Sequence, residues 1–298
     1  MAILAKNTRF RAYQLGNAGS SFSYCNGTTF FLIEARLTEK SKPSLVKELS
    51  LFNKKHIDTL DITSWDNDHC NPNELIHILN DFRPSRIEFP GYEPSTDDGK
   101  ESLRLIKKYE EVLKGNNHTI TLAKVTPEYI TNLSDAEDGF GYSNILYHPK
   151  KLYDNSNNNS LVKLFRCGSF TVLSLGDVEA PEIAEIIMNS KISKTQVDVM
   201  ILAHHGADNG FTTDKFLKTI KPLMTVCSSN YDNQFEHPKQ EIKDLLYQND
   251  IRNFTTKTGD VIVKSTNQHT GDFCVVNLIS DNEAVSSTYN YKSKRLGN

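Results

Sequence analysis

The sequence lacks several features that would define the environment of the protein. Its five cysteines are odd in number and show no CxxC spacing; they are Cys25, Cys70, Cys167, Cys227 and Cys274. This usage argues against a disulfide framework or a thiolate zinc site, and it favours a reducing compartment. The first residues contain too short an apolar run for a signal peptide, and no apolar run reaches membrane-spanning length. We therefore expect a soluble, cytoplasmic protein with no membrane association.

An excess of positive charge is also missing. The 298 residues carry a formal net charge of −3 at pH 7, which excludes a general electrostatic attraction to nucleic acid. A long duplex would need local basic patches, and the candidates are Lys215, Lys218, Lys221 and residues 292–295. A short charged tail such as 292–295 is more often only solvated than a binding element.

Strand patterns and helix patterns alternate along most of the chain. Apolar runs rich in β-branched residues are typical of buried strands, and they occur at 57–62, 161–166, 170–175, 197–203 and 223–228. Helical patterns follow many of these runs, at 181–189, 213–220 and 240–248. This alternation indicates the α/β class. We expect one domain over residues 1–280, followed by a polar tail over residues 281–298.

The most informative stretch is the loop of residues 63–70, which carries Asp66, Asp68 and His69. It lies between the predicted strand 57–62 and a helix for which Asn71 is a suitable N-cap. Three titratable groups so close together repel or desolvate one another unless a cation is present. The alternative interpretation is an Asx-rich turn that only caps the helix.

Other polar side chains also lie at or just beyond the ends of predicted strands. These are Asp177, His204, His205 and His237. In α/β proteins the residues that perform chemistry usually lie on loops at strand ends, where rigid strands position them. Imidazole nitrogens and carboxylate oxygens together suit zinc or manganese. The sequence therefore predicts a metal site built from several strand ends.

The order of these motifs resembles the metallo-β-lactamase fold. The motifs are Ser64-x-Asp66-x-Asp68-His69, then Gly176-Asp177, then His204-His205-Gly206, and finally His237-Pro238. More narrowly, they are similar to the branch that holds the C-terminal domain of the competence protein ComEC and the phosphorylcholine esterases. The resemblance covers residues 8–279 and implies a four-layer αββα sandwich, with the metal site at one edge between the two sheets. Members of this family are mostly hydrolases, and many act on phosphodiesters or nucleic acid.

The resemblance also implies roles for individual residues. One tightly bound zinc or manganese ion would be held by Asp68, His69, Asp177 and His237. Asp177 would bridge to a second, weaker position at which Asp66 is the matching ligand. His204 and His205 would act beside the scissile group as phosphate binders or as a general acid, and Asp66 would assist catalysis through the weaker ion. The chain departs from the family pattern at Ser64, where relatives have histidine, and at Trp65, where the usual residue is small or proline.

These observations favour a metal-dependent hydrolase, a phosphodiesterase or nuclease that uses a metal-activated water. The alternative is a catalytically degenerate subunit that serves as a binding or regulatory component of a larger assembly, as Ser64 and Trp65 suggest. Hydrolysis of a small phosphoester or cyclic nucleotide would use the same mechanism with a different pocket. The expected partner is a phosphodiester substrate, with nucleic acid as one candidate; the sequence identifies no protein partner.

Overall fold

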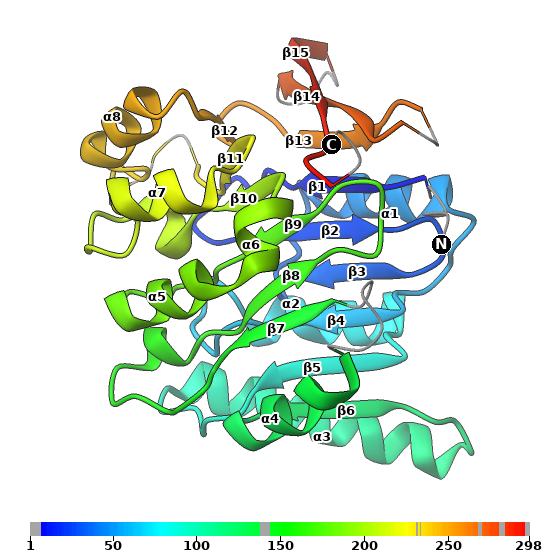
Figure 1. Ribbon diagram of the computed structural model, residues 1–298. Coiled ribbons are helices and arrows are strands. Elements are labelled where there is room, and N and C mark those ends of the chain that lie inside the picture. Colours follow the sequence, from blue (N-terminus) through cyan, green and yellow to red (C-terminus); the bar gives the residue numbers. More distant parts are fainter. Residues whose placement is uncertain are drawn as a thin grey trace.

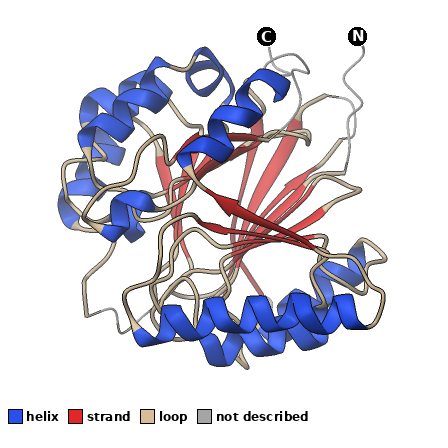
Figure 2. Ribbon diagram, turned by 90° about the horizontal axis from the view of Figure 1, so that it is seen from below, coloured by secondary structure: helices blue, strands red, loops and turns tan. Residues whose placement is uncertain are grey.

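The computed structural model describes residues 7–137, 144–230, 232, 234–267, 270–279 and 284–295. Two β-sheets pack face to face, and helices cover the outer side of each sheet (Figures 1 and 2). The four-layer αββα arrangement predicted from the sequence is therefore confirmed.

The larger sheet has nine strands, in the order β15-β14-β13-β1-β2-β3-β4-β5-β6. The strands from β3 to β6 run parallel, and the others pair in antiparallel fashion. Their bounds are β1 Arg9–Ala12, β2 Phe22–Cys25, β3 Phe30–Ile33, β4 Thr59–Asp61, β5 Arg86–Pro90, β6 Thr121–Val125, β13 Val261–Ser265, β14 Asp272–Ile279 and β15 Ala284–Lys292. The helical segments that follow its strands in the first half of the chain are α1 Lys42–Leu51, α2 Pro72–His77, the π-helical turn η1 Ile78–Phe82 and α3 Asp97–Gly115.

The smaller sheet has six strands, in the order β12-β11-β10-β9-β8-β7. Strands β9 to β12 are parallel, whereas β7, β8 and β9 pair in antiparallel fashion. The strands are β7 Ile145–His148, β8 Val162–Phe165, β9 Val172–Ser174, β10 Val199–Ile201, β11 Met224–Cys227 and β12 Arg252–Thr255. The helical segments of this half are α4 Pro127–Glu137, η2 Ser156–Asn159, α5 Pro181–Asn189, α6 Lys191–Gln196, η3 Ala203–Gly206, α7 Asp214–Ile220 and α8 Gln240–Gln248.

Three main apolar layers hold these elements together. In β3, Phe31 and Ile33 point into the core between the sheets, while Phe30 and Leu32 pack under the helices on the other face. Because both faces of the strand are covered, it reads as a continuous apolar run rather than an alternating one. A third layer packs the helices of the second half against the outer face of the smaller sheet.

The segment after residue 280 differs from the sequence-based expectation. Residues 284–292 form β15, which pairs along its whole length with β14 and is therefore a strand rather than a tail. Tyr289 and Tyr291 lie on the face of β15 that points toward the sandwich. Their rings contact Phe254 and Phe273, respectively, with ring centroids 5.6 Å apart in each pair. The strands β2, β7 and β12 and the helices α4 and α6 were also not anticipated. The extent of the domain, set at residue 280 from the sequence, stays a prediction.

Two further observations concern the expected environment. All five cysteines lie in the part of the chain that the structure describes, and all are free thiols. Among the helices within the described ranges, none combines the length and the apolar character needed to cross a membrane.

The parallel strands of each sheet place their carboxyl ends on a common edge. In the larger sheet, β3 ends before Glu34 and β4 ends before the loop that carries Asp68 and His69. In the smaller sheet, β9 ends before Asp177 and β10 ends before the turn with His205. Since the two sheets are stacked, these four exits face the same end of the sandwich, which is where α/β folds place their sites.

Candidate metal centre

The loop after β4 is closed by its own backbone. The carbonyl of Asp66 accepts hydrogen bonds from the amides of His69 (2.9 Å) and Cys70 (2.8 Å). The Asn71 side chain then caps α2 by accepting from the amides of Asn73 (3.0 Å) and Glu74 (3.2 Å). A rigid loop that ends in a capped helix fixes the direction of the side chains it carries. The helix-capping interpretation of this stretch is therefore confirmed, and the metal-ligand interpretation stays a prediction.

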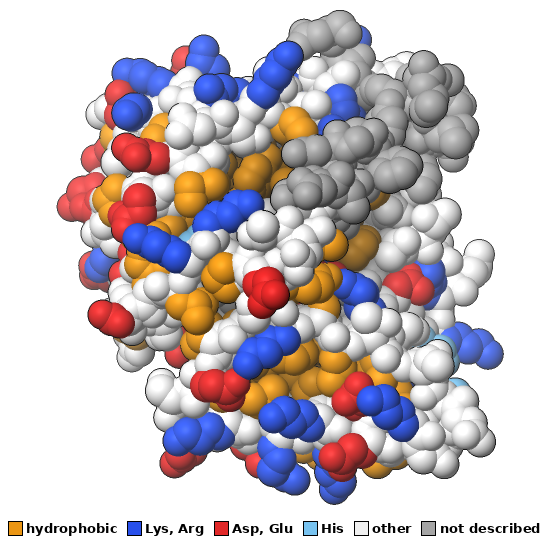
Figure 3. All heavy atoms as spheres, turned by 60° about the horizontal axis from the view of Figure 1, so that its bottom comes forward, with side chains coloured by type: hydrophobic (Ala, Val, Ile, Leu, Met, Phe, Trp, Pro, Cys, Tyr) orange, Lys and Arg blue, Asp and Glu red, His pale blue; other side chains and the backbone are white. Residues whose placement is uncertain are grey.

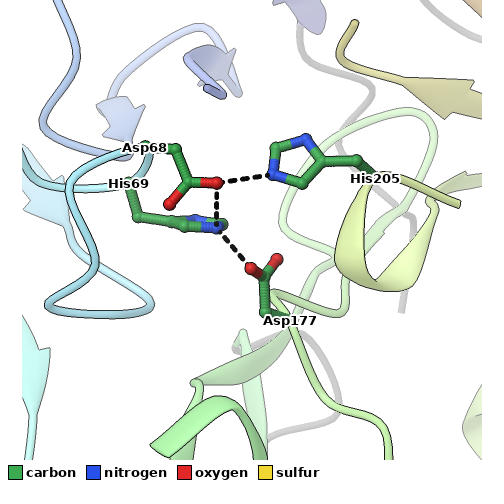
Figure 4. Close-up of side chains that lie close together, drawn as sticks. All are labelled: Asp68, His69, Asp177 and His205. Carbon is green, nitrogen blue, oxygen red and sulfur yellow. Dashed lines mark hydrogen bonds and ion pairs between the residues drawn. The ribbon is translucent and has the colours of Figure 1, made fainter. Parts of the chain in front are cut away.

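Four side chains converge beside this loop, as Figure 4 shows. They are Asp68, His69, Asp177 and His205, and one ligand atom from each lies within 4.8 Å of the others. His69 Nε2 is 2.9 Å from Asp177 Oδ2 and 3.9 Å from Asp68 Oδ2. His205 Nε2 is 3.2 Å from Asp68 Oδ2. The cluster joins residues more than a hundred positions apart in sequence, and it lies where the two sheets meet.

The donor set fits a divalent transition metal. Two imidazole nitrogens and two carboxylate oxygens are a common ligand set for zinc and related ions. The Nε2 atom of His69 is fully buried and makes no hydrogen bond of acceptable geometry, although Asp177 is close. A buried nitrogen in this condition is costly unless something else satisfies it. A cation shared with the neighbouring carboxylates would do so.

The charges of the cluster depend on one another. Burial disfavours the imidazolium form of His69, but the carboxylates of Asp177, Asp68 and Glu34 outweigh burial and raise its pKa well above the usual value. Burial would raise the pKa of Asp177, yet His69 and the other imidazoles lower it. Without a cation, the site is therefore held together as imidazolium–carboxylate pairs. A metal ion would take the place of the imidazole protons.

Glu34 orients His69 from behind. Its Oε1 is 3.1 Å from His69 Nδ1, and both side chains are about 2% exposed. The same carboxylate accepts hydrogen bonds from the Thr63 hydroxyl (2.5 Å) and the Thr63 amide (3.0 Å). A carboxylate on the second nitrogen of a histidine fixes the ring and its tautomer, leaving Nε2 free for a ligand. Sequence reasoning did not assign Glu34 a role, although its position directly after a strand was a usable signal.

His205 is held by its backbone and by two neighbours. His204 and His205 have φ values of 46° and 53°, in the left-handed region that residues other than glycine rarely adopt. His205 Nδ1 lies 3.2 Å from the carbonyl oxygen of Ser228 and 3.4 Å from the Ser20 hydroxyl. Strain of this kind persists only where the surroundings enforce it, and it is common at functional sites. The turn directs Nε2 of His205 toward Asp68.

His204 occupies a different place from its neighbour. Its Nδ1 is 2.7 Å from Glu179 Oε1, and its Nε2 is 4.0 Å from Asp177 Oδ2. Glu179 in turn accepts hydrogen bonds from the amide groups of Asn155 and Asn157, both at 3.0 Å. The imidazole therefore has one nitrogen close to a carboxylate, without a hydrogen bond of acceptable geometry, and the other turned toward the cluster. This is the arrangement expected of a proton donor or a phosphate contact.

Two of the predicted metal ligands are not part of the four-residue cluster. The ring of His237 stacks on that of His205, with centroids 6.2 Å apart at an angle of 10°. Burial and the nearby His205 and His204 lower the pKa of His237 to about 4. Asp66 accepts a hydrogen bond from the hydroxyl of Ser64 (2.9 Å). The structure thus brings together three of the predicted ligands, and adds His205, which was predicted to act in catalysis.

A small cavity opens beside the cluster. Its volume is about 110 Å³, and polar groups form much of its lining. Asp68, His204 and His205 form one part of the wall, and Phe235 and His237 form another. The remaining lining residues are Ala18, Gly19, Ser228, Ser229 and Asn230. The candidate ligands therefore reach a space that a small charged group can enter.

Two packed sheets with helices outside, and a His/Asp cluster at the edge where they meet, define the architecture. This is the architecture that the resemblance to the metallo-β-lactamase fold implied. The chain is 23% identical over 233 residues to ComE operon protein 3 of Bacillus subtilis (strain 168), which supports the branch suggested by the motifs. That match covers 78% of this chain and 27% of the relative, so this chain spans about a quarter of the relative's length.

Solved structures described as a metallo-β-lactamase fold protein and a metallo hydrolase are similar to this chain at low identity and low TM-score. The metallo-β-lactamase fold protein YhfI from Bacillus subtilis is 10% identical, with a TM-score of 0.47, covering 86% of this chain and 100% of YhfI. The metallo hydrolase Igni18 from Ignicoccus hospitalis is 12% identical, with a TM-score of 0.45, covering 85% of this chain and 98% of Igni18. No model of a known protein family matches the sequence.

Proposed function

We propose that this protein is a metal-dependent hydrolase that cleaves phosphodiester bonds. The observation that carries the proposal is the convergence of Asp68, His69, Asp177 and His205 at the wall of a small cavity. A divalent cation in such a site supplies a Lewis acid for the phosphoryl oxygen and activates a water molecule. Zinc or manganese suits this mixed nitrogen and oxygen donor set. The resemblance to metallo-β-lactamase fold hydrolases supports the same reaction class.

The side chains of this site divide the work between them. The metal ion would be bound by Asp68, His69, Asp177 and His205, and Glu34 would orient His69. His204 stands beside this set, with Nδ1 on Glu179 and Nε2 facing inward. In this position Nε2 can donate a proton to the leaving oxygen, or contact the phosphoryl group. The sequence predicted one shared role for the two histidines. We propose instead that His205 helps to hold the metal and that His204 acts on the substrate.

The test is hydrolysis of bis(4-nitrophenyl) phosphate and of short DNA and RNA strands, with zinc or manganese supplied. We expect chelation to abolish turnover. Replacing His204 by alanine should lower kcat by about 10²–10⁴-fold, the usual range for general acid–base assistance, with metal content unchanged. If the parent protein cleaves none of these substrates with either metal, the hydrolase proposal fails.

A second candidate function has an observation in its favour. Trp65, at the position that departs from the family pattern, is about 2% exposed, and its indole nitrogen donates to the Tyr92 carbonyl (3.0 Å). Ser64, at the other altered position, bonds to Asp66 instead of adding a nitrogen ligand. A chain altered in this way could serve as a binding or regulatory component of a larger assembly. It would then hold a metal and bind phosphodiesters without cleaving them.

A further inference from the structure

An aromatic stack leads from the candidate metal centre to the surface. The ring of His237 packs on His205, and on its other side the ring of Phe235 packs on His237, with centroids 5.7 Å apart at 24°. Phe235 is 54% exposed and lines the same small cavity as Asp68. The stack therefore connects a residue of the cluster with a partly exposed apolar ring in the wall of the cavity.

The size of the cavity limits what can enter it. At about 110 Å³ it is well below the volume of a typical small-molecule pocket, which is about 300–1,000 Å³. A phosphoryl group can enter such a space, whereas an attached nucleoside cannot. The nucleoside must then lie outside the cavity, at the rim where Phe235 is exposed.

Lys221 and Lys294, two of the basic residues that could recruit a duplex, lie away from the site. Lys294 Nζ donates to the carbonyls of Ile220 (2.9 Å) and Lys221 (3.2 Å), where α7 ends before the start of β11. Lys218 pairs with Asp214 at 2.7 Å. Since the site lies beyond the carboxyl ends of β10 and β11, the group around Lys294 is at the opposite end of these strands.

Neither the overall charge nor the face shown in Figure 3 has a large excess of basic side chains. On the face shown in Figure 3, basic and acidic side chains are interspersed. The formal net charge is −3, so long-range attraction to a polyanion is weak. Short-range contacts near the cavity, ring stacking among them, must then supply much of the binding.

From these observations we propose that Phe235 is a stacking platform for one unpaired nucleobase, and that the substrate of the site is single-stranded nucleic acid. This inference rests on the proposed phosphodiester function and specifies its substrate class. Base–aromatic stacking tolerates any base because every base has a π-face. In a duplex, both faces of each internal base are already stacked on neighbours, so only an unpaired base can use the ring.

The experiment compares the parent protein with Phe235→Ala, Phe235→Tyr and Tyr247→Ala. Tyr247 on α8 is the matched control, because it is an aromatic residue that is 85% exposed and does not line this cavity. The probes are a fluorescein-labelled oligothymidylate, the same strand with abasic residues, and a duplex of equal length. KM is measured with manganese supplied. If no cleavage occurs, Kd of the same probes is measured by fluorescence anisotropy with the same protein.

We expect Phe235→Ala to raise KM or Kd for oligothymidylate by about 5- to 150-fold, the range for loss of one stacked base. Phe235→Tyr and Tyr247→Ala should behave like the parent. Phe235→Ala should not affect the abasic strand, and the duplex should be the poorest probe for the parent protein. The inference is overturned if the parent binds no oligothymidylate, if Phe235→Ala has no effect, or if it affects the abasic strand equally.

The two proposals fail in different ways. If oligothymidylate is cleaved and its KM is unchanged by Phe235→Ala, the stacking platform is contradicted but the proposed phosphodiesterase activity is supported. Binding that depends on Phe235 and on the base, without cleavage of any phosphodiester, contradicts the hydrolase and supports the platform.

Discussion

The orientation of a single imidazole depends on Glu34, whose carboxylate lies 3.1 Å from His69 Nδ1. If this contact fixes the ring for a metal ion, replacing Glu34 by glutamine should weaken zinc binding by about 10–100-fold, as is typical when the partner of a ligating histidine is lost. Isothermal titration calorimetry of the metal-free protein with zinc measures the change.

The control for this variant is Glu48→Gln. Glu48 is another buried carboxylate, about 1% exposed, but it pairs with Arg9 and Arg11 rather than with a histidine. This substitution should lower the free energy of unfolding without altering zinc affinity in the protein that remains folded. Equal zinc affinities for Glu34→Gln and the parent would contradict the orienting role.

Sequence reasoning reached part of this site at the residue scale. Asp68, His69 and Asp177 could be predicted because each lies directly on a short loop after a strand. That His205 rather than His237 belongs to the cluster could not be predicted. It depends on the left-handed backbone at 204–205, which only the folded surroundings impose. Glu34 was missed because a single acidic residue after a strand has many explanations, and its partner His69 lies 35 positions later.

Between the sheets, Lys163 of β8 joins the smaller sheet to β4 and β5 of the larger one. Its Nζ lies 2.7 Å from Asp61 Oδ2 and 2.6 Å from Glu88 Oε2, and all three side chains are buried. Burial raises the pKa of Asp61 to about 6 even with the lysine beside it. Replacing Lys163 by alanine should therefore lower the free energy of unfolding by about 3–5 kcal/mol, because it leaves buried carboxylates uncompensated.

Urea unfolding at neutral pH measures this loss, and Lys124→Ala provides the matched comparison. Lys124 forms its ion pair with Glu93 at 2.6 Å on the surface, where both side chains are exposed. Exposed pairs contribute about 0–1 kcal/mol. A loss at Lys163 no larger than that at Lys124 would show that the inter-sheet ion pairs do not stabilise the sandwich.

At the scale of elements, the buried parallel strands were the easiest to predict, since apolar runs such as 197–203 are covered on both faces. The strand β15 was not predicted, because its outward-facing positions are polar and only Tyr289 and Tyr291 mark the inner face. Its pairing partner β14 supplies the context that turns this weak alternation into a strand.

The end of the chain is joined to the rest of the molecule through Asp198. This buried carboxylate accepts hydrogen bonds from the Ser293 hydroxyl (2.8 Å), the Lys294 amide (2.8 Å) and the Thr171 amide (2.9 Å). Burial nevertheless raises the pKa of Asp198 to about 6. In the window between the ordinary aspartate value and about 6, the folded protein binds more protons than the unfolded chain. This carboxylate's contribution to stability must therefore decrease as pH rises through that window.

For Asp198→Asn this contribution to the pH dependence should vanish. The difference in unfolding free energy between parent and variant should change by about 2 kcal/mol between pH 4 and pH 7, in the direction that disfavours the parent at higher pH. Other titrating groups, Asp61 included, are common to both proteins and cancel in the difference. Urea unfolding at the two pH values gives the result, and a difference that does not vary with pH would contradict it.

For the molecule as a whole, the central claim is that folding of the two sheets assembles a metal centre from Asp68, His69, Asp177 and His205. The most direct test is the zinc content of purified protein, loaded with zinc and freed of excess, for the parent, Asp177→Asn and Asp66→Asn. Asp66 is the matched control, because it is a carboxylate of the same site loop that bonds to Ser64 and lies outside the cluster. We predict about one tightly held ion in the parent and in Asp66→Asn, and a loss of that ion in Asp177→Asn. A parent protein that retains no zinc, or an Asp66→Asn protein that loses it as completely as Asp177→Asn, would contradict the claim.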